Sequence, residues 1–248
     1  MIELYHWEPN AASARVLIAL EEKGLEFQSR HVDLLAFEQF APAFLALNEA
    51  GQAPVMVHDG QAFTEASFIC EYLDETFPDP PLLPMAPLDR WVARAWQKEV
   101  DDFLAAAVSD LAWAALGAPK MTGAELEAAV AAIPGKARRD QWQAAIRGLD
   151  AGELDKARER VGLIARKTEA DLQDRDWLAP GGFSLADIAV YAYLNYLPRL
   201  APELLGERTA AWLARTSARP AVKAAEAMGR TGDPYGVAAP GPEHIRWG

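Results

Sequence analysis

A proline-rich stretch about one third of the way along the chain constrains the fold more than any other feature. Residues 78–88 read PDPPLLPMAPL and contain five prolines. Proline fixes φ and has no backbone N–H, so this stretch can be neither the interior of a helix nor a central strand. The chain has 248 residues, enough for two domains. We therefore expect the stretch to be a linker between two parts of different structure.

The part before the prolines alternates between strand-like and helix-like segments. The predicted order is β-α-β-α-β-β-α, with the first two strands parallel because a helix connects them. Asp59-Gly60 is a preferred type I′ turn pair, which predicts a hairpin of the last two strands. The predicted strands are residues 2–7, 25–33, 54–58 and 61–64. The predicted helices are residues 13–23, 37–48 (a weaker one, interrupted by Pro42) and 65–77.

The part after the prolines is predicted to be helical throughout. Residues 117–151 are rich in Ala, Arg and Gly and look like an insertion between helices. The tail, residues 230–248, is too rich in Gly and Pro for regular structure. The helical segments are 88–116, 152–173, 184–197 and 207–216.

Composition excludes several classes of function. The formal net charge of −12 argues against a nucleic-acid partner, which Lys and Arg would have to neutralise. No apolar run approaches the ~18 residues of a membrane span, and no signal peptide is visible. Cys70 is the one cysteine, so the chain has no internal disulfide. We expect a cytoplasmic protein with no membrane association.

Pro54 stands at the head of a predicted strand, in EAGQAPVMVHDG (49–60), where proline cannot donate to a β-ladder. A cis Ala53–Pro54 bond would turn the N–H and C=O of Ala53 outward, so that a peptide could dock there like an added strand. The alternative is an ordinary proline at a sheet edge.

A helix begins directly downstream, at TEAS (64–67). Its free backbone N–H groups attract a carboxylate, and Glu65 beside them could hold an ammonium group. Together with a peptide-docking edge, this arrangement suits a ligand with an amino-acid end and a peptide body. The alternative is ordinary helix capping by Thr64 and Ser67.

Five segments of the chain form a recognisable set: IELYHW, PNAASARVLIALEEKGLEF, GQAPVMVHDG, FTEASFICEYLDETFP and GGFSLADIAVYAYL. In the last segment, Ser184 caps a helix and Asp187 stands three residues on, which predicts a capping box for a buried helix with a folding role. Together these segments resemble the glutathione S-transferase family over nearly the whole chain.

The resemblance implies an α/β thioredoxin-like N-terminal domain and an all-α C-terminal domain. It divides the chain into a glutathione-binding domain (1–79), the Pro-rich linker (80–88), a helical domain forming the electrophile pocket (89–229) and an irregular tail (230–248). The family usually forms homodimers.

The resemblance also implies which residues bind glutathione as co-substrate. Pro54 takes the position of the cis proline, and Ala53 pairs its backbone with the cysteinyl unit. Gln52 stands where a side chain meets the glycine carboxylate, and Glu65 where a carboxylate holds the γ-glutamyl amine. The usual Ser after that Glu is Ala66 here, with Ser67 one position later. Gln39, from the second-helix region, is a further candidate.

The catalytic position departs from the family pattern. Members activate the thiol with a Tyr, Ser or Cys near the start of the first helix, but this chain has EPNAASAR (8–15) there. Ser13 and Asn10 are the candidates left to stabilise a thiolate, helped by the positive end of the helix. The alternative for Ser13 is helix capping. His6, His31 and His58 lack metal-site spacing, so we expect no metal.

The insertion ARRDQW (137–142), the tail and the FTEASFICEYLDETFP motif are most similar to bacterial, sphingomonad-type glutathione-dependent lignin β-aryl etherases. This implies thiolate attack on the β-carbon of an α-keto β-aryl ether. Alternatives are a general detoxifying transferase or dehalogenase, and a non-catalytic interaction protein. The electrophile is expected to be hydrophobic and aromatic. Six aromatic residues could bound its pocket, or pack in the core or dimer interface: Trp91, Trp96, Phe103, Trp113, Tyr193 and Tyr196.

Overall fold

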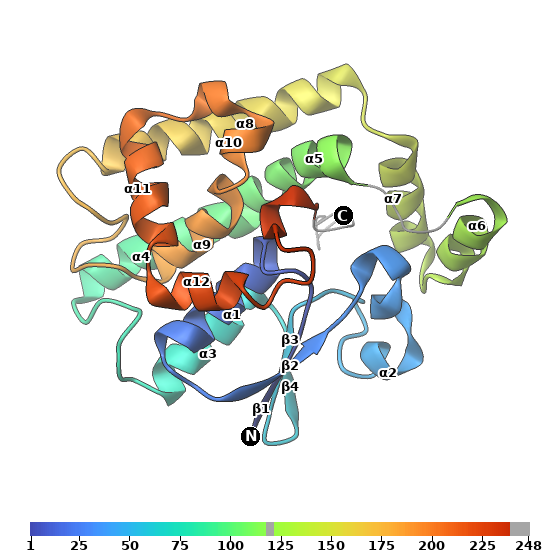
Figure 1. Cartoon of the computed structure of the whole chain (residues 1–248), viewed down its shortest axis with the longest axis horizontal. Helices are drawn as coiled ribbons and strands as arrows, with labels where there is room; N and C mark the ends of the chain where they lie inside the picture. The colour runs from blue at the N-terminus through green and yellow to red at the C-terminus, as the bar shows by residue number, and fades with distance from the viewer. Residues whose placement is uncertain (118–121, 239–248) are drawn as a thin grey trace.

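The computed structural model describes residues 1–117 and 122–238. An α/β half comes first in the chain and a helical half follows it (Figure 1). The α/β half contains β1 (Ile2–His6), α1 (Ala11–Glu22), β2 (Phe27–His31), β3 (Val55–His58), β4 (Gln61–Phe63) and α3 (Ala66–Thr76).

The strands form one four-stranded sheet in the order β2-β1-β3-β4. β1 and β2 are parallel, with Ile2 opposite Phe27, as the connecting helix predicts. β3 runs antiparallel to both β1 and β4, and Met56 pairs with Phe63 in the hairpin. Asp59 and Gly60 have φ values of 49° and 82°, the two positive values that a type I′ turn requires. The predicted thioredoxin-like topology is confirmed.

The predicted helix over residues 37–48 is wrong. The segment instead contains two 3₁₀ turns, η1 (Leu34–Ala36) and η2 (Glu38–Phe40), and one short helix, α2 (Pro42–Leu45). Pro42 has no N–H to donate backwards, so it can only start a helix, and it stands in the first turn of α2. Phe37 has a φ of 61°, which breaks any helix running through it.

The two faces of the sheet carry separate clusters of apolar side chains. Neighbours in a strand point to opposite faces, and Val55 and Met56 follow this rule. Met56 joins the main core with residues of α1 and α3. Val55 joins a smaller cluster with Trp7 and Phe44, on the face that η1 and α2 cover.

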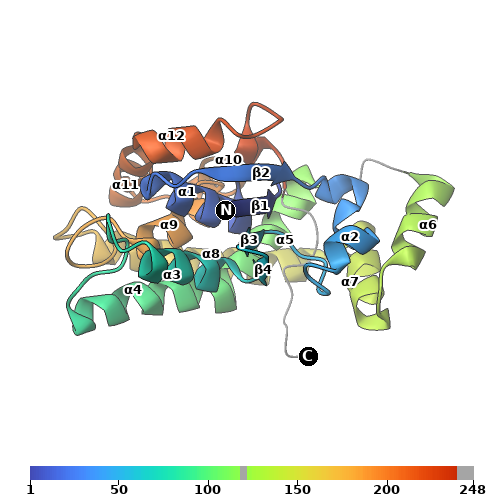
Figure 2. The ribbon, with the colours of Figure 1, turned by 90° about the horizontal axis from the view of Figure 1, so that it is seen from below.

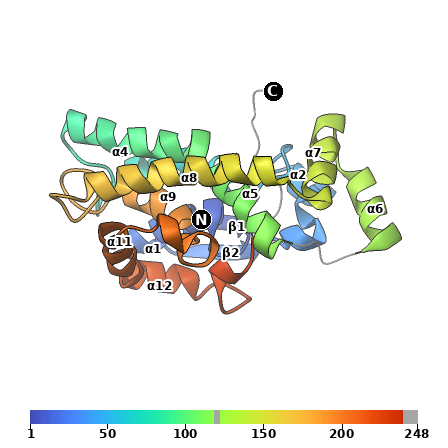
Figure 3. The same cartoon turned by 90° about the horizontal axis from the view of Figure 1, so that it is seen from above.

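The helical half begins with α4 (Pro87–Glu99) and α5 (Ala105–Leu116), joined by a π-helical turn, η3 (Val100–Leu104). The predicted helix 88–116 is thus interrupted in the middle. α8 (Ala151–Asp171) packs against α5, and Figure 3 shows it crossing the molecule as the longest helix. The remaining elements are α6 (Gly123–Ala132), α7 (Lys136–Arg147), α8 (Ala151–Asp171), α9 (Leu185–Leu194), α10 (Leu197–Leu200), η4 (Pro202–Leu204), α11 (Glu207–Ser217), α12 (Pro220–Glu226) and η5 (Pro234–Gly236).

The predicted insertion contains the helices α6 and α7, which lie beside α2 at the edge of the molecule (Figures 1 and 2). Trp142 of α7 packs on Phe37 with ring centroids 4.7 Å apart and on Phe40 at 6.1 Å. The Nε1–H of Trp113 in α5 donates to the carbonyl of Ala145 at 2.8 Å. The insertion therefore connects the helical half to the η1–η2 segment.

The proline-rich segment is fixed by polar contacts. Lys23, at the end of α1, donates from Nζ to the carbonyls of Phe77 and Pro80 and forms a 2.7 Å ion pair with Asp74. The Asp74 carboxylate also accepts from the backbone N–H of Leu82 at 2.7 Å.

α1 is buried along most of its length and contacts α3 of its own half and α9 and α12 of the other.

The predicted capping box at the start of α9 is confirmed. The Ser184 side chain caps the first turn, and the Asp187 carboxylate accepts from the Ser184 N–H at 3.0 Å. Asp187 is fully buried and also accepts from the indole N–H of Trp212 at 2.9 Å and the N–H of Leu178. Burial raises the pKa of Asp187 to about 6, even though these donors favour its charged form.

The six aromatic residues named above divide between core and surface. Trp96, Tyr193 and Tyr196 are each 1% exposed, and Trp113 is also buried in the main core. Trp91 and Phe103 are 65% and 53% exposed. Within residues 1–117 and 122–238, no helix combines the length and apolar character needed to span a membrane.

Candidate functional site

The predicted docking edge lies in the loop that enters β3. The Ala53–Pro54 peptide bond is cis, as the resemblance to the family implies. Asn48 fixes the loop before it, because its Nδ2–H donates to the carbonyl of Gln52 at 2.8 Å and its Oδ1 accepts from the N–H of Ala50 at 3.0 Å. Ala53 and Gln52 are half-buried, and Pro54 is buried.

Glu65 stands at the N-cap position of α3 with a φ of 74°. Residues other than glycine rarely adopt a positive φ, and those that do cluster at functional sites. The Glu65 carbonyl accepts from the N–H of Ile69 at 2.8 Å, so α3 begins directly after it. The first-turn N–H groups, among them those of Ala66 and Ser67, have no intrahelical acceptor.

The Ser67 hydroxyl belongs to a polar cluster that the sequence did not reveal. Arg15 of α1 donates from Nη2 to Ser67 Oγ at 2.5 Å and from Nη1 to Asp101 Oδ1 at 2.5 Å. Ser67 Oγ–H in turn donates to Asp101 Oδ2. Burial is the largest single effect on Arg15 and disfavours its charge, but Asp101, Tyr193 and Cys70 together outweigh it and raise the pKa of the guanidinium. These residues are too far apart in sequence for any spacing rule to connect them.

Gln39 is 2% exposed and lies in η2. Its Nε2–H donates to the carbonyl of Leu34 at 3.3 Å, while its Oε1 is buried without a hydrogen-bond partner. The side chain is therefore turned into the protein in this structure.

Ser13 is buried in the first turn of α1, which begins at Ala11, two residues earlier than predicted. Asn10, not Ser13, occupies the N-cap position. Ser13 Oγ accepts from the backbone N–H of Trp7 at 3.1 Å. A serine hydroxyl that accepts one hydrogen bond still has its own hydrogen to donate.

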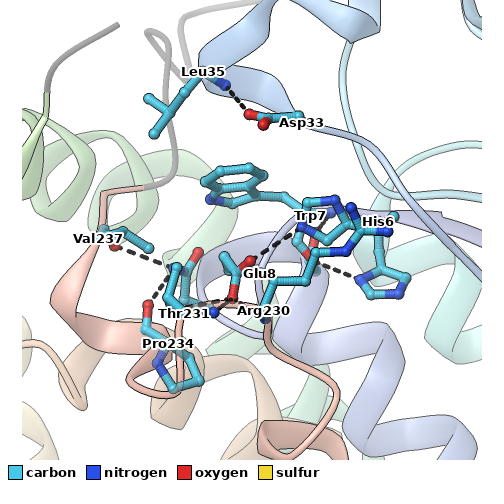
Figure 4. A network of polar contacts seen from close by, with 12 residues as sticks. His6, Trp7, Glu8, Asp33, Leu35, Arg230, Thr231, Pro234 and Val237 are labelled. Carbon is cyan, nitrogen blue, oxygen red and sulfur yellow. Dashed lines mark hydrogen bonds and ion pairs between the residues drawn. The ribbon is translucent and has the colours of Figure 1, made fainter. Parts of the chain in front are cut away.

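Asn10 faces the C-terminal segment. Its Nδ2 group donates to the carbonyl of Pro234 at 2.6 Å and to that of Val237 at 3.2 Å. Both amide hydrogens thus have acceptors, and the residue is 1% exposed. Figure 4 shows Pro234 and Val237 beside the loop that carries Trp7 and Glu8.

Glu8 is a further polar residue of this loop that sequence reasoning missed. It is 1% exposed, and its Oε1 accepts from His31 Nε2 at 3.1 Å. Its Oε2 accepts from the backbone N–H of Arg230 at 2.9 Å. Nearby, burial lowers the pKa of His6, whose Nε2 lies 2.7 Å from Ser29 Oγ.

Two other features bear on the chemistry of the described residues. Burial raises the pKa of the Cys70 thiol to about 12, so this cysteine is not a reactive nucleophile. Among residues 1–117 and 122–238, no three or more His, Cys, Asp or Glu side chains gather as a metal-binding group.

Comparison with known families gives two matches along the chain. The N-terminal domain profile of glutathione S-transferases matches residues 1–75. The corresponding C-terminal domain profile matches residues 105–223.

Individual relatives agree with these matches. Protein LigF of Sphingobium sp. is 37% identical over 236 residues, covering 90% of this chain and 91% of LigF. The crystal structure of the beta-etherase LigF from Sphingobium sp. superposes with a TM-score of 0.85 and 35% identity, covering 92% of this chain and 99% of that one. A glutathione-bound theta class transferase of Xanthomonas axonopodis pv. citri, 23% identical, shares the fold with a TM-score of 0.71, covering 90% of this chain and 96% of that one.

Proposed function

This chain belongs to the glutathione S-transferase family, and we propose that it is a glutathione-dependent β-etherase that cleaves aryl ethers of lignin-derived compounds. The observation that carries the proposal is the similarity to the beta-etherase LigF, which extends over nine tenths of both chains and is matched by the structural superposition.

In the proposed reaction, the glutathione thiol loses its proton and the thiolate attacks the β-carbon of an α-keto β-aryl ether. The C–S bond forms as the C–O bond breaks, and a phenolate leaves with the electron pair of that bond and takes up a proton. The products are a glutathione thioether and a phenol. The reaction is a substitution at carbon, so it needs no oxidant or reductant.

We propose that glutathione binds across the starts of β3 and α3. Ala53, next to the cis bond to Pro54, supplies the backbone edge, and Gln52 meets the glycine carboxylate. Glu65 holds the γ-glutamyl amine. This position is supported by the loop geometry at Ala53 and by the left-handed backbone of Glu65.

The γ-glutamyl carboxylate would then meet the first-turn N–H groups of Ala66 and Ser67, where the helix dipole favours an anion. The Ser67 hydroxyl is already bound by Arg15 and Asp101, so we assign Ser67 a backbone contact. Gln39 would reach glutathione only after turning out of its buried position.

For activation of the thiol we propose Ser13 as the donor to the thiolate. Its oxygen is held by the Trp7 N–H, which leaves the hydroxyl hydrogen for the sulfur. Asn10 was the other candidate, and its amide hydrogens are engaged by Pro234 and Val237. We therefore propose that Asn10 acts only indirectly, by holding the C-terminal segment through the Pro234 and Val237 carbonyls.

We further infer a homodimer with a cytoplasmic location. Large apolar side chains on α3 and at the start of α4 are exposed, with Phe68 and Leu88 at 71% and Trp91 at 65%. A second copy covering this face would remove them from water. Reduced glutathione as co-substrate favours the cytoplasm.

The direct test is turnover of a keto β-aryl ether dimer with glutathione, followed by release of the phenol and formation of the thioether. Reactions without glutathione are the control. Turnover of chlorodinitrobenzene or haloalkanes without any ether cleavage would instead indicate a general transferase or dehalogenase. No retention on immobilised glutathione would indicate an interaction protein.

A further inference from the structure

We propose that Glu8 is a positioning residue that fixes the C-terminal segment, residues 230–238, across the start of α1, where the segment forms one wall of the electrophile site. The inference rests on the proposed function, because it concerns the pocket next to the proposed thiolate donor, Ser13.

The Glu8 carboxylate accepts hydrogen bonds from residues near both ends of the chain. Oε2 accepts from the Arg230 N–H at 2.9 Å, from the Thr231 N–H at 3.4 Å and from Thr231 Oγ1 at 3.2 Å. Oε1 lies 3.1 Å from His31 Nε2. A carboxylate that is 1% exposed is costly unless such partners surround it, so its place in the structure depends on the segment being there.

Gly229 permits this close approach. A Cβ atom at this position would lie 2.9 Å from Glu8 Oε2 and 3.2 Å from Pro9 Cδ. A side chain there would therefore push the carboxylate or the segment away. The absence of a side chain at residue 229 is independent support for the contact between Glu8 and the segment.

Beyond Thr231, the segment turns its carbonyls toward the same loop (Figure 4). Asn10 Nδ2 donates to the carbonyls of Pro234 and Val237, and Trp7 Nε1–H donates to that of Ala238 at 3.3 Å. On its other side, Tyr196 Oη–H donates to the Val237 carbonyl at 2.8 Å. The segment is thus held between the loop after β1 and the helical half.

This arrangement connects Glu8 to the reacting end of the site. Trp7 precedes Glu8 in the chain, and its N–H is the group that holds Ser13 Oγ. Val237 packs on the cluster that contains Trp7 and Val55, and Ala53 lies against that same cluster. Apolar atoms of the segment therefore border the place where an aromatic electrophile would meet the thiolate.

The test compares Glu8→Ala with wild type in the full-length protein. We expect the KM for a keto β-aryl ether and for chlorodinitrobenzene to rise roughly tenfold, while the glutathione Kd changes less than about twofold. Hydrogen exchange at the Arg230 and Thr231 amides should accelerate. The matched control is Glu22→Ala, which removes another largely buried carboxylate, paired with Arg219 at 2.5 Å, away from the segment. It should lower stability without changing either readout.

Two further variants keep the proposal testable if Glu8→Ala does not fold. Gly229→Ala and Thr231→Val should each raise the electrophile KM in the same direction by a smaller factor. Glu8→Gln should retain most of the wild-type behaviour, because its carbonyl oxygen can face the segment while its amide faces His31.

The proposal is wrong if electrophile KM and amide exchange stay at wild-type values in the variants that fold. It is also wrong if glutathione affinity falls in step with electrophile affinity. Failure of the proposed function is distinguishable: wild type would then leave the aryl ether intact, while the effect of Glu8 would still be measured with chlorodinitrobenzene and by amide exchange.

Discussion

Arg15 and Asp101 form an ion pair between the two halves of the protein, with 2.5 Å between Nη1 and Oδ1. The Arg15 side chain is 3% exposed, whereas that of Asp101, in the π-helical turn η3, is 40% exposed. Ser67, at the start of α3, completes the cluster. The helix that carries the proposed thiolate donor is therefore fixed to the helical half and to the proposed glutathione site.

Replacing Asp101 with Ala should reduce the free energy of unfolding by about 2–3 kcal/mol. The change leaves the buried Arg15 charge without its partner, and the loss stays at or below the ~3–5 kcal/mol of fully buried pairs because Asp101 is partly exposed. Urea denaturation measures it. The matched control is Asp102→Ala, which removes only the exposed pair with Lys98 and should cost less than ~1 kcal/mol. Equal losses of unfolding free energy in the two variants would show that the Arg15–Asp101 pair contributes no more than an exposed ion pair.

Replacing Glu65 with Ala should abolish most of the rise in melting temperature that glutathione causes in wild type. The proposed partner of the γ-glutamyl amine is lost, so glutathione binding no longer stabilises the folded state. Thermal melts with and without glutathione provide the measurement. Glu75→Ala, an exposed change on the same helix, serves as the control. Undiminished protection of the Glu65 variant would place the amine elsewhere.

Replacing Ser13 with Ala should raise the pKa of the bound glutathione thiol and lower kcat by about 10–100-fold. The hydroxyl donor to the thiolate is removed, whereas the contacts to the peptide backbone remain, so glutathione Kd should change little. The ultraviolet absorbance of the thiolate against pH reports the pKa directly. Ser217→Ala, whose hydroxyl donates to the Ala214 carbonyl in α11, is the control. An unchanged thiol pKa would exclude Ser13 as the donor.

Asp187 should make stability fall as the pH rises. Its pKa in the folded protein is raised by burial to about 6, above the ~3.9 of an unfolded Asp, so the folded state holds the proton more tightly. Its contribution is fully present below pH ~4 and is lost by about pH 6, with a magnitude on the order of 3 kcal/mol. Denaturation of wild type and Asp187→Asn across this range isolates the effect as a difference. If the free energy of unfolding of wild type instead rises with pH relative to that of Asp187→Asn, the four donors, from Leu178, Ser184 and Trp212, outweigh burial.

Much of the fold could be predicted from local sequence. The parallel pair of β1 and β2 follows from the helix that connects them, and the β3–β4 hairpin follows from the Asp59-Gly60 turn, both of which are local signals. The antiparallel pairing of β1 with β3 has no such local signal. The Ser184–Asp187 capping box is local as well. The 37–48 segment could be predicted only in part. Pro42 signals a break locally, whereas the packing of Phe37 and Phe40 against Trp142 of α7 involves a distant part of the chain.

The candidate site divides in the same way. Ala53, Pro54 and Glu65 could be named from the sequence because the residues of the proposed glutathione edge lie close together in the chain. Asn10 and Ser13 could be named but not assigned, because their hydrogen bonds depend on residues that come from elsewhere in the sequence. Asn10 faces Pro234 and Val237, and no spacing rule connects positions 10 and 234.

The sequence by itself thus determined the two-part architecture, the parallel β1–β2 pair and the β3–β4 hairpin, and it named the residues of the proposed glutathione edge. Local sequence suffices for these features because turns, caps and hydrophobic periodicity act between near neighbours. Only the tertiary structure decided which polar groups of the β1–α1 loop are engaged. Folding buried Glu8 and Asn10 beneath residues 230–238 and placed Arg15 against Asp101. The physical reason is that a buried polar group takes the partner that folding brings within reach, and these partners are separated by tens to hundreds of residues.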